Sequence, residues 1–383
     1  MTTRVSRPPP AGAGAAAQWP AYTAQAAPAA HARPAETGAA PQATADGTPR
    51  RGLVLGGGGM LGAAWTVGAL CAVEEATGHR PGDAEVLLGT SAGAILAALL
   101  TGGVGADQLR DHQRGLPVTA GPLARLDFDY DTAVGGALPP RPRVGIGSPG
   151  LLRDAVRHPR AHPLLTTVSA MAPHGRGSLA TVGELVRGLH GPGGWPAASP
   201  LRVAAVDYRT GHRVVFGDRG APPAAIADAV MASCAIPGWF TPVRVDGSAY
   251  VDGGCWSATN ADLMIGRGLD EVFVLAPMAL RLEPRERDGS GRGTLAALRE
   301  WHAARDRPRG VLAQLVGGYR RAVTRQLMRE AGLLRATGVR VHLLAPTPAD
   351  LAVMGPNLMD PARRAAVLES SLRTSRAALD GVR

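Results

Sequence analysis

The stretch VLLGTSAGAIL, residues 86–96, decides the fold. Its opening apolar run is too short for a helix, and small and apolar residues continue after Gly93 at helical spacing. The stretch therefore predicts a buried strand, a sharp turn carrying Ser91, and a helix whose N-terminal dipole favours an anion near the serine. Gly89 and Gly93 remove Cβ atoms that would collide in such a turn. Gly-x-Ser-x-Gly also arises by chance in a chain with 51 glycines, so the flanking strand and helix carry the interpretation.

A glycine loop follows an earlier apolar run, in the sequence GLVLGGGGMLG at residues 52–62. The apolar run predicts a strand, and residues 63–76 predict a helix. A glycine loop between a strand and a helix presents several backbone N–H groups to one point. We therefore interpret Gly57, Gly58, Gly59 and Gly62 as an oxyanion loop. A tight turn without a chemical role is the simpler alternative.

The same glycines also fit a dinucleotide-binding fingerprint, Gly-x-Gly-x-x-Gly. That fingerprint needs an acidic residue about twenty positions further on, at the end of a second strand. Asp83 and Glu85 precede the next apolar run instead of following it. The oxyanion loop is therefore the favoured interpretation, and no organic cofactor is expected.

An aspartate, Asp252, directly follows two apolar strand residues and precedes Gly253 and Gly254. A carboxylate at the end of a strand, with glycines after it, is unshielded on one side and can approach a partner closely. Asp-Gly-Gly is also an ordinary turn, and alone it indicates only a structural role.

Together with residues 231–238, MASCAIPG, these three motifs resemble the patatin-like phospholipases over residues 52–275. The resemblance implies an α/β fold in three layers, with a mainly parallel sheet sandwiched by helices. It implies a Ser-Asp dyad without histidine, in which Ser91 attacks an ester carbonyl and Asp252 accepts its proton. It also implies an oxyanion hole, motif-supporting glycines, and neither a metal nor an organic cofactor. The residues concerned are Gly57, Gly58, Gly59 and Gly62 for the hole, and Gly89, Gly93, Gly253 and Gly254 for support.

One position departs from the pattern of that family. Many members carry an arginine where this sequence has Leu61, just before Gly62. The charge proposed to support the oxyanion loop is absent at that position. The resemblance therefore implies a hole made of backbone donors alone, with low activity or a different headgroup as possible consequences.

Composition divides the chain into segments. Residues 1–49 are mostly Ala, Pro, Gly and Thr, cannot bury enough apolar surface to fold, and are predicted to be disordered. Residues 50–383 are predicted to form one catalytic domain. Within it, residues 105–200 are interpreted either as a cap or lid over the acyl pocket or as a loosely packed insertion. Residues 281–310 are predicted to form a surface loop or linker.

The charge balance points to anionic partners. The formal net charge is +10, and all 41 basic residues are arginine. Residues 311–337 predict an amphipathic helix with Arg320, Arg321, Arg325 and Arg329 on its polar side, which favours contact with anionic membrane headgroups or simply a solvated face. Nucleic acid is not an expected partner, because no basic stripe interleaved with aromatic residues occurs. The oligomeric state cannot be read from these residues.

Three cysteines, together with residues 1–49, here called the leader, bear on the cellular compartment of the protein. Cys71, Cys234 and Cys255 are widely spaced and predict buried thiols in a reducing compartment, not a disulfide framework or a zinc site. The leader lacks the apolar segment of a secretory signal, and no run reaches the roughly 18–20 apolar residues of a membrane span. These observations predict a cytoplasmic protein, peripheral to a membrane if the arginines bind headgroups.

Two rival functions stay open from sequence alone. The first is an α/β-hydrolase with a Ser-His-Asp triad, for which His302 and His342 are the available late histidines. The second is a catalytically silent protein that binds lipid or acts as a scaffold on the same fold. The favoured prediction is a serine acyl hydrolase that cleaves carboxylic esters of lipids, such as phospholipids or acylglycerols.

Overall fold

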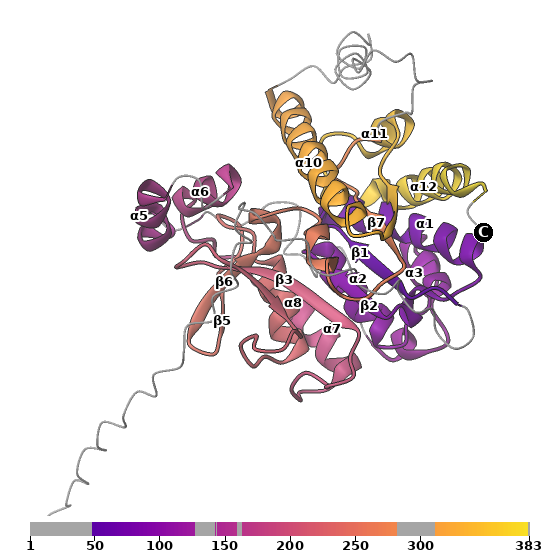
Figure 1. Ribbon diagram of the computed structural model, residues 1–383, viewed down its shortest axis with the longest axis horizontal. Coiled ribbons are helices and arrows are strands. Elements are labelled where there is room, and N and C mark those ends of the chain that lie inside the picture. Colours follow the sequence, from indigo (N-terminus) through magenta and orange to yellow (C-terminus); the bar gives the residue numbers. More distant parts are fainter. Residues whose placement is uncertain (1–47, 127–141, 143, 159–162, 282–310, 382–383) are drawn as a thin grey trace, which may run out of the picture.

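A computed structural model describes residues 48–126, 142, 144–158, 163–281 and 311–381. The predicted disordered leader and the predicted 281–310 loop therefore lie almost entirely outside the described residues. The described chain forms one eight-stranded sheet in the order β5-β6-β3-β2-β1-β7-β8, with β4 also paired to β3 (Figure 1). The strands are β1 (Arg51–Leu55), β2 (Val86–Gly89), β3 (Leu201–Asp207), β4 (Arg213–Phe216), β5 (Val243–Val245), β6 (Ser248–Asp252), β7 (Glu271–Leu275) and β8 (Arg340–Leu344).

The centre of the sheet is parallel and one end is antiparallel. Strands β3, β2, β1, β7 and β8 run parallel to their neighbours, whereas β4 and β6 pair antiparallel with β3, and β5 pairs antiparallel with β6. Parallel strands need crossover connections, and helices supply them here. The predicted fold class, a mainly parallel sheet between helices, is confirmed.

Helices cover both faces of the sheet. They are α1 (Gly59–Thr77), α2 (Ala92–Thr101), α3 (Ala106–Gln113), α5 (Pro149–Arg157), α6 (Leu164–Met171), α7 (Ala180–His190), α8 (Ile226–Cys234), α10 (Val311–Arg335), α11 (Pro348–Met354) and α12 (Arg364–Leu379). Side chains of α1, α2, α7, α8 and α12 share one hydrophobic cluster, and α10 packs in a second cluster.

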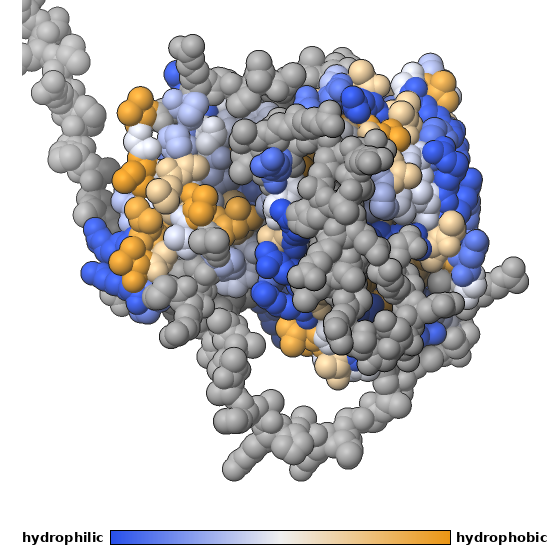
Figure 2. Space-filling model, turned by 90° about the horizontal axis from the view of Figure 1, so that it is seen from above, coloured by the Kyte–Doolittle hydropathy of each residue, from blue (hydrophilic) through white to orange (hydrophobic). Residues whose placement is uncertain are grey.

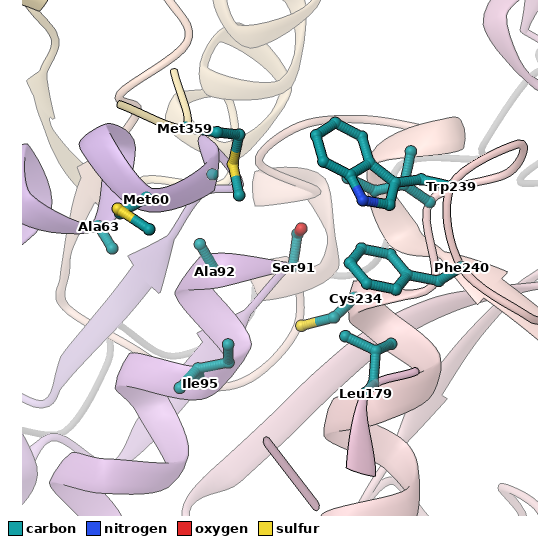
Figure 3. Close-up of a pocket in the computed structure, with 12 residues that line it drawn as sticks. Met60, Ala63, Ser91, Ala92, Ile95, Leu179, Cys234, Trp239, Phe240 and Met359 are labelled. Carbon is teal, nitrogen blue, oxygen red and sulfur yellow. The ribbon is translucent and has the colours of Figure 1, made fainter. Parts of the chain in front are cut away.

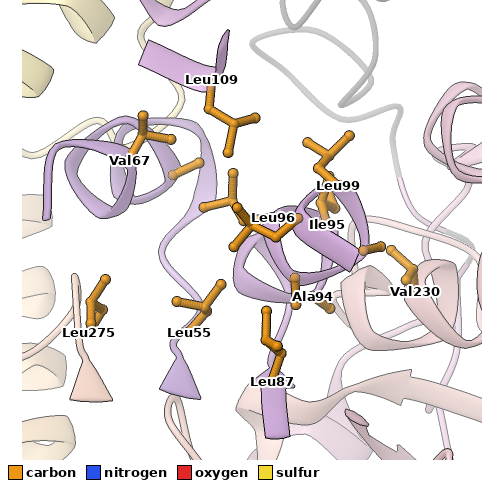
Figure 4. Packing of buried hydrophobic residues seen from close by; sticks show 14 of the residues in the cluster. Leu55, Val67, Leu87, Ala94, Ile95, Leu96, Leu99, Leu109, Val230 and Leu275 are labelled. Atoms are coloured by element: carbon orange, nitrogen blue, oxygen red, sulfur yellow. The ribbon is translucent and has the colours of Figure 1, made fainter. Parts of the chain in front are cut away.

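Alternation along the strands separates these two clusters. Leu55 and Leu87 contribute to the cluster under α1 and α2, whereas the adjacent Val54 and Leu88 contribute to the cluster with α10. Side chains of successive strand residues point to opposite faces, which produces this division. Figure 4 shows Leu55, Leu87 and Leu275 in the packing beneath Leu96 of α2. Both faces are buried, as a parallel sheet in an α/β protein requires.

The region of residues 105–200 is not uniform. Helix α7 packs against α2 and α8 and so belongs to the main helical layer. Helices α5 and α6 instead form a hairpin at one end of the molecule, at the upper left of Figure 1, far from α1 and α12. Whether this hairpin acts as a cap stays a prediction.

Several elements differ from the sequence-based expectation. Helix α1 begins at Gly59, so the end of the glycine loop forms its first turn. The sequence of residues 260–266 predicts a helix, but the structure has only a short 3-10 turn, Ala261–Met264, between a left-handed Asn260 and an extended Ile265. Helices α3, α6 and α11 were not predicted, because their segments of 8, 8 and 7 residues are too short to show a helical period.

Candidate active site

Ser91 and Asp252 meet because β2 and β6 end close to each other on the same edge of β3. Val203 of β3 pairs with Gly89 at the end of β2, and Ala205 pairs with Asp252 at the end of β6. Both Val203 and Ala205 also pair with β4, so β2 and β6 share the opposite edge of β3. Since β2 runs parallel to β3 and β6 runs antiparallel, their C-terminal ends face each other. Ser91 therefore lies beside a carboxylate that is distant in the sequence.

The turn after β2 holds Ser91 in a strained conformation. Its φ of 54° and ψ of −125° lie outside the regions that residues with a side chain normally adopt, at a typical cost of about 1–3 kcal/mol. A Cβ at Gly93 would overlap the carbonyl oxygen of Leu55, and a Cβ at Gly89 would overlap the Cα of Ala94. Glycine is thus sterically required at both positions, and the predicted strand, turn and helix are confirmed.

Ser233 of α8 connects this turn to β3 through two hydrogen bonds. Its fully buried hydroxyl donates to the carbonyl oxygen of Ala204 at 2.7 Å and accepts from the Ser91 N–H at 2.9 Å. The strained turn is therefore tied to β3 through one side chain. Sequence reasoning included Ser233 only within the segment 231–238, because a serine in a small-residue helix shows no sign of its partners.

Asn260 links the serine turn to the aspartate turn. It is fully buried and has a left-handed backbone, with a φ of 55°. Its Nδ2 donates to Thr90 Oγ1 at 3.1 Å and to the carbonyl oxygen of Ser257 at 2.7 Å. Thr90 directly precedes Ser91, and Ser257 lies shortly after Asp252. The sequence offers no signal for this role beyond a polar residue after a glycine-rich turn.

Asp252 is a buried carboxylate in contact with Ser91. The residue is 5% exposed, its Oδ1 accepts from the Gly254 N–H at 2.6 Å, and its side chain is near enough to the Ser91 side chain for that hydroxyl to affect the pKa of the carboxyl. Burial raises the pKa of Asp252 to about 6, while the hydrogen bonds from Ser91 and Gly254 oppose this rise. The carboxylate is therefore a stronger base than an exposed aspartate, and it titrates near neutral pH.

The two glycines after Asp252 are required by close contacts. A Cβ at Gly253 would overlap the carbonyl oxygen of Ala204 in β3, and a Cβ at Gly254 would lie 2.9 Å from Asp252 Oδ1. The first glycine lets the turn approach the sheet, and the second keeps one side of the carboxylate clear.

The glycine loop offers fewer free donors than the sequence suggests. The Gly57 N–H donates to the carbonyl oxygen of Ala258 at 2.9 Å, and the Gly62 N–H donates to that of Gly58 at 3.0 Å. Gly57 and Gly62 therefore cannot donate to an oxyanion without breaking these bonds, which corrects the predicted set of four. Within the described part of the chain, the N–H groups of Gly58 and Gly59 have no acceptor.

Gly57 and Gly59 are required for other reasons. A Cβ at Gly57 would lie 3.1 Å from the Cβ of Ser91, so a side chain there would crowd the serine. Gly59 has a φ of 63°, a conformation that favours glycine. Leu61, at the position where the resemblance leads one to expect arginine, is fully buried in the hydrophobic core.

An apolar pocket opens beside the Ser91 hydroxyl (Figure 3). It holds about 550 Å³ of empty space, part of which is open to solvent. Figure 3 shows the Ser91 oxygen between Met359 on one side and Trp239 and Phe240 on the other. Almost all of its lining is apolar, from Gly59, Met60, Ala63, Ala92, Ile95, Leu179, Cys234, Ile236, Trp239, Phe240 and Met359. Such a lining suits a hydrocarbon chain and offers little to a charged ligand.

The described histidines do not complete a triad with Ser91. His342 lies in β8, stacked on Phe273 with ring centroids 4.5 Å apart, and its Nε2 is 3.5 Å from Glu271 Oε2. Strands β1 and β7 separate β8 from β2. His302 lies outside the described residues. No histidine from the described ranges lines the pocket.

Metal sites, disulfides and membrane spans are considered for the described residues only. These residues contain no group of three or more His, Cys, Asp or Glu side chains that could hold a metal ion. Cys71, Cys234 and Cys255 are free and buried. No helix in the described ranges combines the length and the apolar character needed to cross a lipid bilayer.

Comparison with known families decides the assignment. The sequence profile described as Patatin-like phospholipase matches residues 53–265, more than half of the chain. The chain belongs to the patatin-like phospholipase family. This family assignment confirms the resemblance seen in the sequence and supports lipid acyl hydrolysis as the general activity.

One solved structure that matches this chain is VipD from Legionella pneumophila. The crystal structure of VipD matches this patatin-like chain with a TM-score of 0.39 and 15% sequence identity. The match covers 89% of this chain and 69% of the VipD chain. A likeness of this size is too weak to bear on the activity of the patatin-like protein.

Proposed function

We propose that the protein is a serine acyl hydrolase that cleaves carboxylic esters of lipids through a dyad of Ser91 and Asp252. The observation that carries this proposal is the proximity of Ser91 and Asp252. A strained serine at a helix N-terminus and a buried carboxylate with a raised pKa lie in contact beside an apolar pocket. A nucleophile next to a base is the arrangement that covalent acyl transfer needs.

The chemistry follows from this geometry. The Ser91 hydroxyl attacks the ester carbonyl while Asp252 accepts its proton, and the tetrahedral intermediate carries the charge on its oxygen. Free N–H groups of Gly58 and Gly59 supply hydrogen bonds to that oxygen, each such donor being worth about 2.7–4 kcal/mol in enzymes of this kind. The proton then passes to the leaving alcohol, which departs and leaves an acyl-serine. Water, deprotonated by Asp252, hydrolyses the acyl-serine in the second step.

The pocket selects the acyl part of the substrate. Its apolar lining removes hydrocarbon from water, with a gain of about 0.8 kcal/mol for each buried methylene. We therefore expect esters with several methylenes in the acyl chain to be hydrolysed faster than acetate esters. The excess of arginine favours peripheral contact with an anionic lipid surface.

Labelling by a fluorophosphonate tests this proposal most directly, because the reagent reacts only with an activated serine. We expect the wild type to label, Ser91→Ala to lose labelling, and Asp252→Asn to label at least about a hundredfold more slowly. Asp83→Asn, an exposed aspartate far from the site, is the matched control and should label like the wild type. A folded wild type that does not label would instead support the silent lipid-binding alternative.

A further inference from the structure

The hairpin formed by α5 and α6 has an inverted pattern of polarity. On α6, the buried side chains include Thr166 and Ser169, whereas Leu165, Val168 and Met171 are exposed. A helix on the surface of a protein normally presents its polar face to water and its apolar stripe to the core. The outer stripe of α6 is therefore apolar, and its exposure to water is unfavourable unless another surface covers it.

The apolar surface extends beyond α6. Of eleven exposed large hydrophobic residues in the described chain, six lie between residues 144 and 171. Figure 2 shows hydrophobic side chains gathered at the left of the molecule, the end where Figure 1 places α5 and α6. The six are Val144, Ile146, Val156, Leu165, Val168 and Met171, with Val144, Val156 and Met171 at 107%, 75% and 60% exposure. A contiguous apolar patch on a surface marks an interaction site.

Basic side chains are interleaved with this apolar surface. Arg153 and Arg157 are exposed on α5, on either side of Val156, and Arg209 is exposed beside the start of α5. None of these three arginines forms an ion pair with another described residue. Apolar side chains among arginines that have no described acidic partner match the two layers of a membrane surface, which are hydrocarbon and anionic headgroup.

The inner face of the hairpin is anchored next to the catalytic aspartate. Thr166 Oγ1 donates to the carbonyl oxygen of Cys255 at 2.7 Å, three residues after Asp252. Tyr208, at the end of β3, donates to the carbonyl oxygen of Ser169 at 3.2 Å. The outer apolar face is thus held at a fixed position relative to the site.

The chain that leaves α6 leads to the pocket. Residues 172–177 run beside residues 237–241, with a hydrogen bond from the Gly177 N–H to the carbonyl oxygen of Trp239 at 2.9 Å. Trp239 lines the pocket, and so does Ile236, which is 39% exposed. The exposed apolar surface therefore continues into the lining of the acyl pocket.

We propose that the outer face of the α5–α6 hairpin docks on an anionic lipid surface and delivers acyl chains to the pocket. This inference rests on the proposed function, because a lipid partner follows from a lipid substrate. The side chains Val156, Leu165, Val168 and Met171 enter the hydrocarbon boundary, and the arginines of α5 contact phosphate groups.

Vesicle binding tests this surface separately from the chemistry. Binding is measured by co-sedimentation with phosphatidylcholine vesicles containing phosphatidylserine, and hydrolysis is measured on a soluble short-chain ester. We expect Val156→Gln/Val168→Gln/Met171→Gln to weaken vesicle binding at least tenfold and to leave soluble-ester hydrolysis within twofold of the wild type. Arg153→Gln/Arg157→Gln should weaken binding only to vesicles that contain phosphatidylserine.

The matched control lies on α10. Met328 and Leu333 are 43% and 58% exposed there, so Met328→Gln/Leu333→Gln removes a similar apolar area from a different face. This control should bind vesicles like the wild type. The surface proposal is overturned if the hairpin variant binds as the wild type does, or if sedimentation velocity shows that the hairpin joins two copies of the chain. If the wild type does not hydrolyse the soluble ester, the proposed function is overturned instead.

A second and independent observation concerns Arg320 on α10. Sequence periodicity placed it on the polar side with Arg325 and Arg329, but it is 4% exposed whereas those two are exposed. Its Nη1 donates to the carbonyl oxygen of Pro277 at 2.8 Å, and its Nη2 lies 3.8 Å from Met354 Sδ. It has no carboxylate partner in the described part of the chain. Burial lowers the pKa of Arg320 to about 10, so the guanidinium is charged at neutral pH.

Pro277 connects this cation to the glycine loop. A Cβ at Gly58 would lie 2.9 Å from Pro277 Cγ, and one at Gly62 would lie 3.3 Å from Pro277 Cβ. The proline ring therefore packs directly on the loop that carries the free N–H groups. A buried cation without a counter-ion is costly, and an anion that forms nearby would offset that cost.

We infer that Arg320 is a positioning residue that holds Pro277 against the glycine loop and places a positive charge behind it. Arg320→Met should then lower kcat about tenfold with KM within twofold, and Arg320→Lys should recover at least half of the activity. Thr324→Val is the matched control, because Thr324 is also buried on α10 and bonds only to backbone groups. The control should lower Tm without lowering kcat. A wild-type kcat for folded Arg320→Met would overturn this inference.

Discussion

The turn around Ser91 and the α5–α6 hairpin are built in opposite ways. Around Ser91, backbone atoms are so close that Gly89 and Gly93 admit no side chain. The N–H of the strained Ser91 is bonded to the Ser233 hydroxyl. On the outer face of the hairpin, side chains such as Val156 and Met171 contact little or nothing. The first region fixes a geometry, whereas the second leaves its side chains free to meet a surface without a fixed shape.

This difference separates two demands on an enzyme that acts on lipid. The reacting atoms must be held within a fraction of an ångström, because small displacements cost much of the rate. The surface that meets a bilayer gains nothing from such precision, since lipid molecules rearrange around it. Substitutions should therefore have large effects in the first region and small effects on stability in the second.

The largest effect is expected for Gly93→Ala. Its Cβ would overlap the carbonyl oxygen of Leu55, so β1 and α2 would have to move apart. Overpacking typically costs about 1–3 kcal/mol and here should reach or exceed the upper value, with loss of hydrolase activity. Gly332→Ala on α10 is the matched control, since nothing lies within 4 Å of its added methyl group. Thermal unfolding measures both variants. Similar losses of stability would contradict the view that the Ser91 turn is packed more tightly than α10.

Ser233→Ala should have the next largest effect. It leaves the Ser91 N–H and the Ala204 carbonyl without their partner, at a cost of about 1–3 kcal/mol. Ser370→Ala removes a similarly buried hydroxyl, which donates to Asp350 at 2.6 Å far from the site. Denaturant unfolding should show comparable losses for the two variants, and kcat should fall at least tenfold only for Ser233→Ala. Equal kcat values would mean that the hydroxyl does not position the serine.

A graded effect is expected from pH, and close to neutral pH it is smaller than the effect of either substitution. In the proposed mechanism Asp252 must be unprotonated to accept the serine proton, and burial raises its pKa to about 6. The value of kcat/KM for a soluble ester should therefore be constant above this pH and fall about tenfold for each pH unit below it. A profile that stays flat down to pH 4 would show that Asp252 is not the base, because a base with a pKa of about 6 is almost fully protonated at pH 4.

The smallest effect on stability is expected on the hairpin. Val156→Gln replaces a side chain that is 75% exposed, so its free energy of unfolding should stay within about 0.5 kcal/mol of the wild type. Guanidinium denaturation measures this difference. A loss above 1 kcal/mol would show that the outer face is part of the folded core and would remove the contrast between the two regions.

Local signals predicted the parts of the site that local sequence builds. The apolar run before Gly89 and the small residues after Gly93 predict the strand, turn and helix, because each step depends on neighbours in the chain. The same holds for β1 and for the turn after Asp252. The sequence could not show that Asp252 ends on the same edge of β3 as β2, since that depends on strand pairing.

The errors have the same origin. Arg320 fits the polar side of a helical pattern, but the packing of α10 on the sheet buries it. Gly57 fits an oxyanion loop, but its N–H is already bonded to the segment after Asp252. Helix α6 was missed because its polar residues face inward and its apolar residues face outward, the reverse of the usual rule. In each case a distant segment of the chain decides the environment.

The meeting of β2 and β6 on one edge of β3 also sets when the site can exist during synthesis. The ribosome completes the serine turn about 160 residues before it reaches Asp252. At 5–20 residues per second, the growing chain carries Ser91 without Asp252 for roughly 10–30 s. A chain released early by truncation would carry the serine and no partner for it.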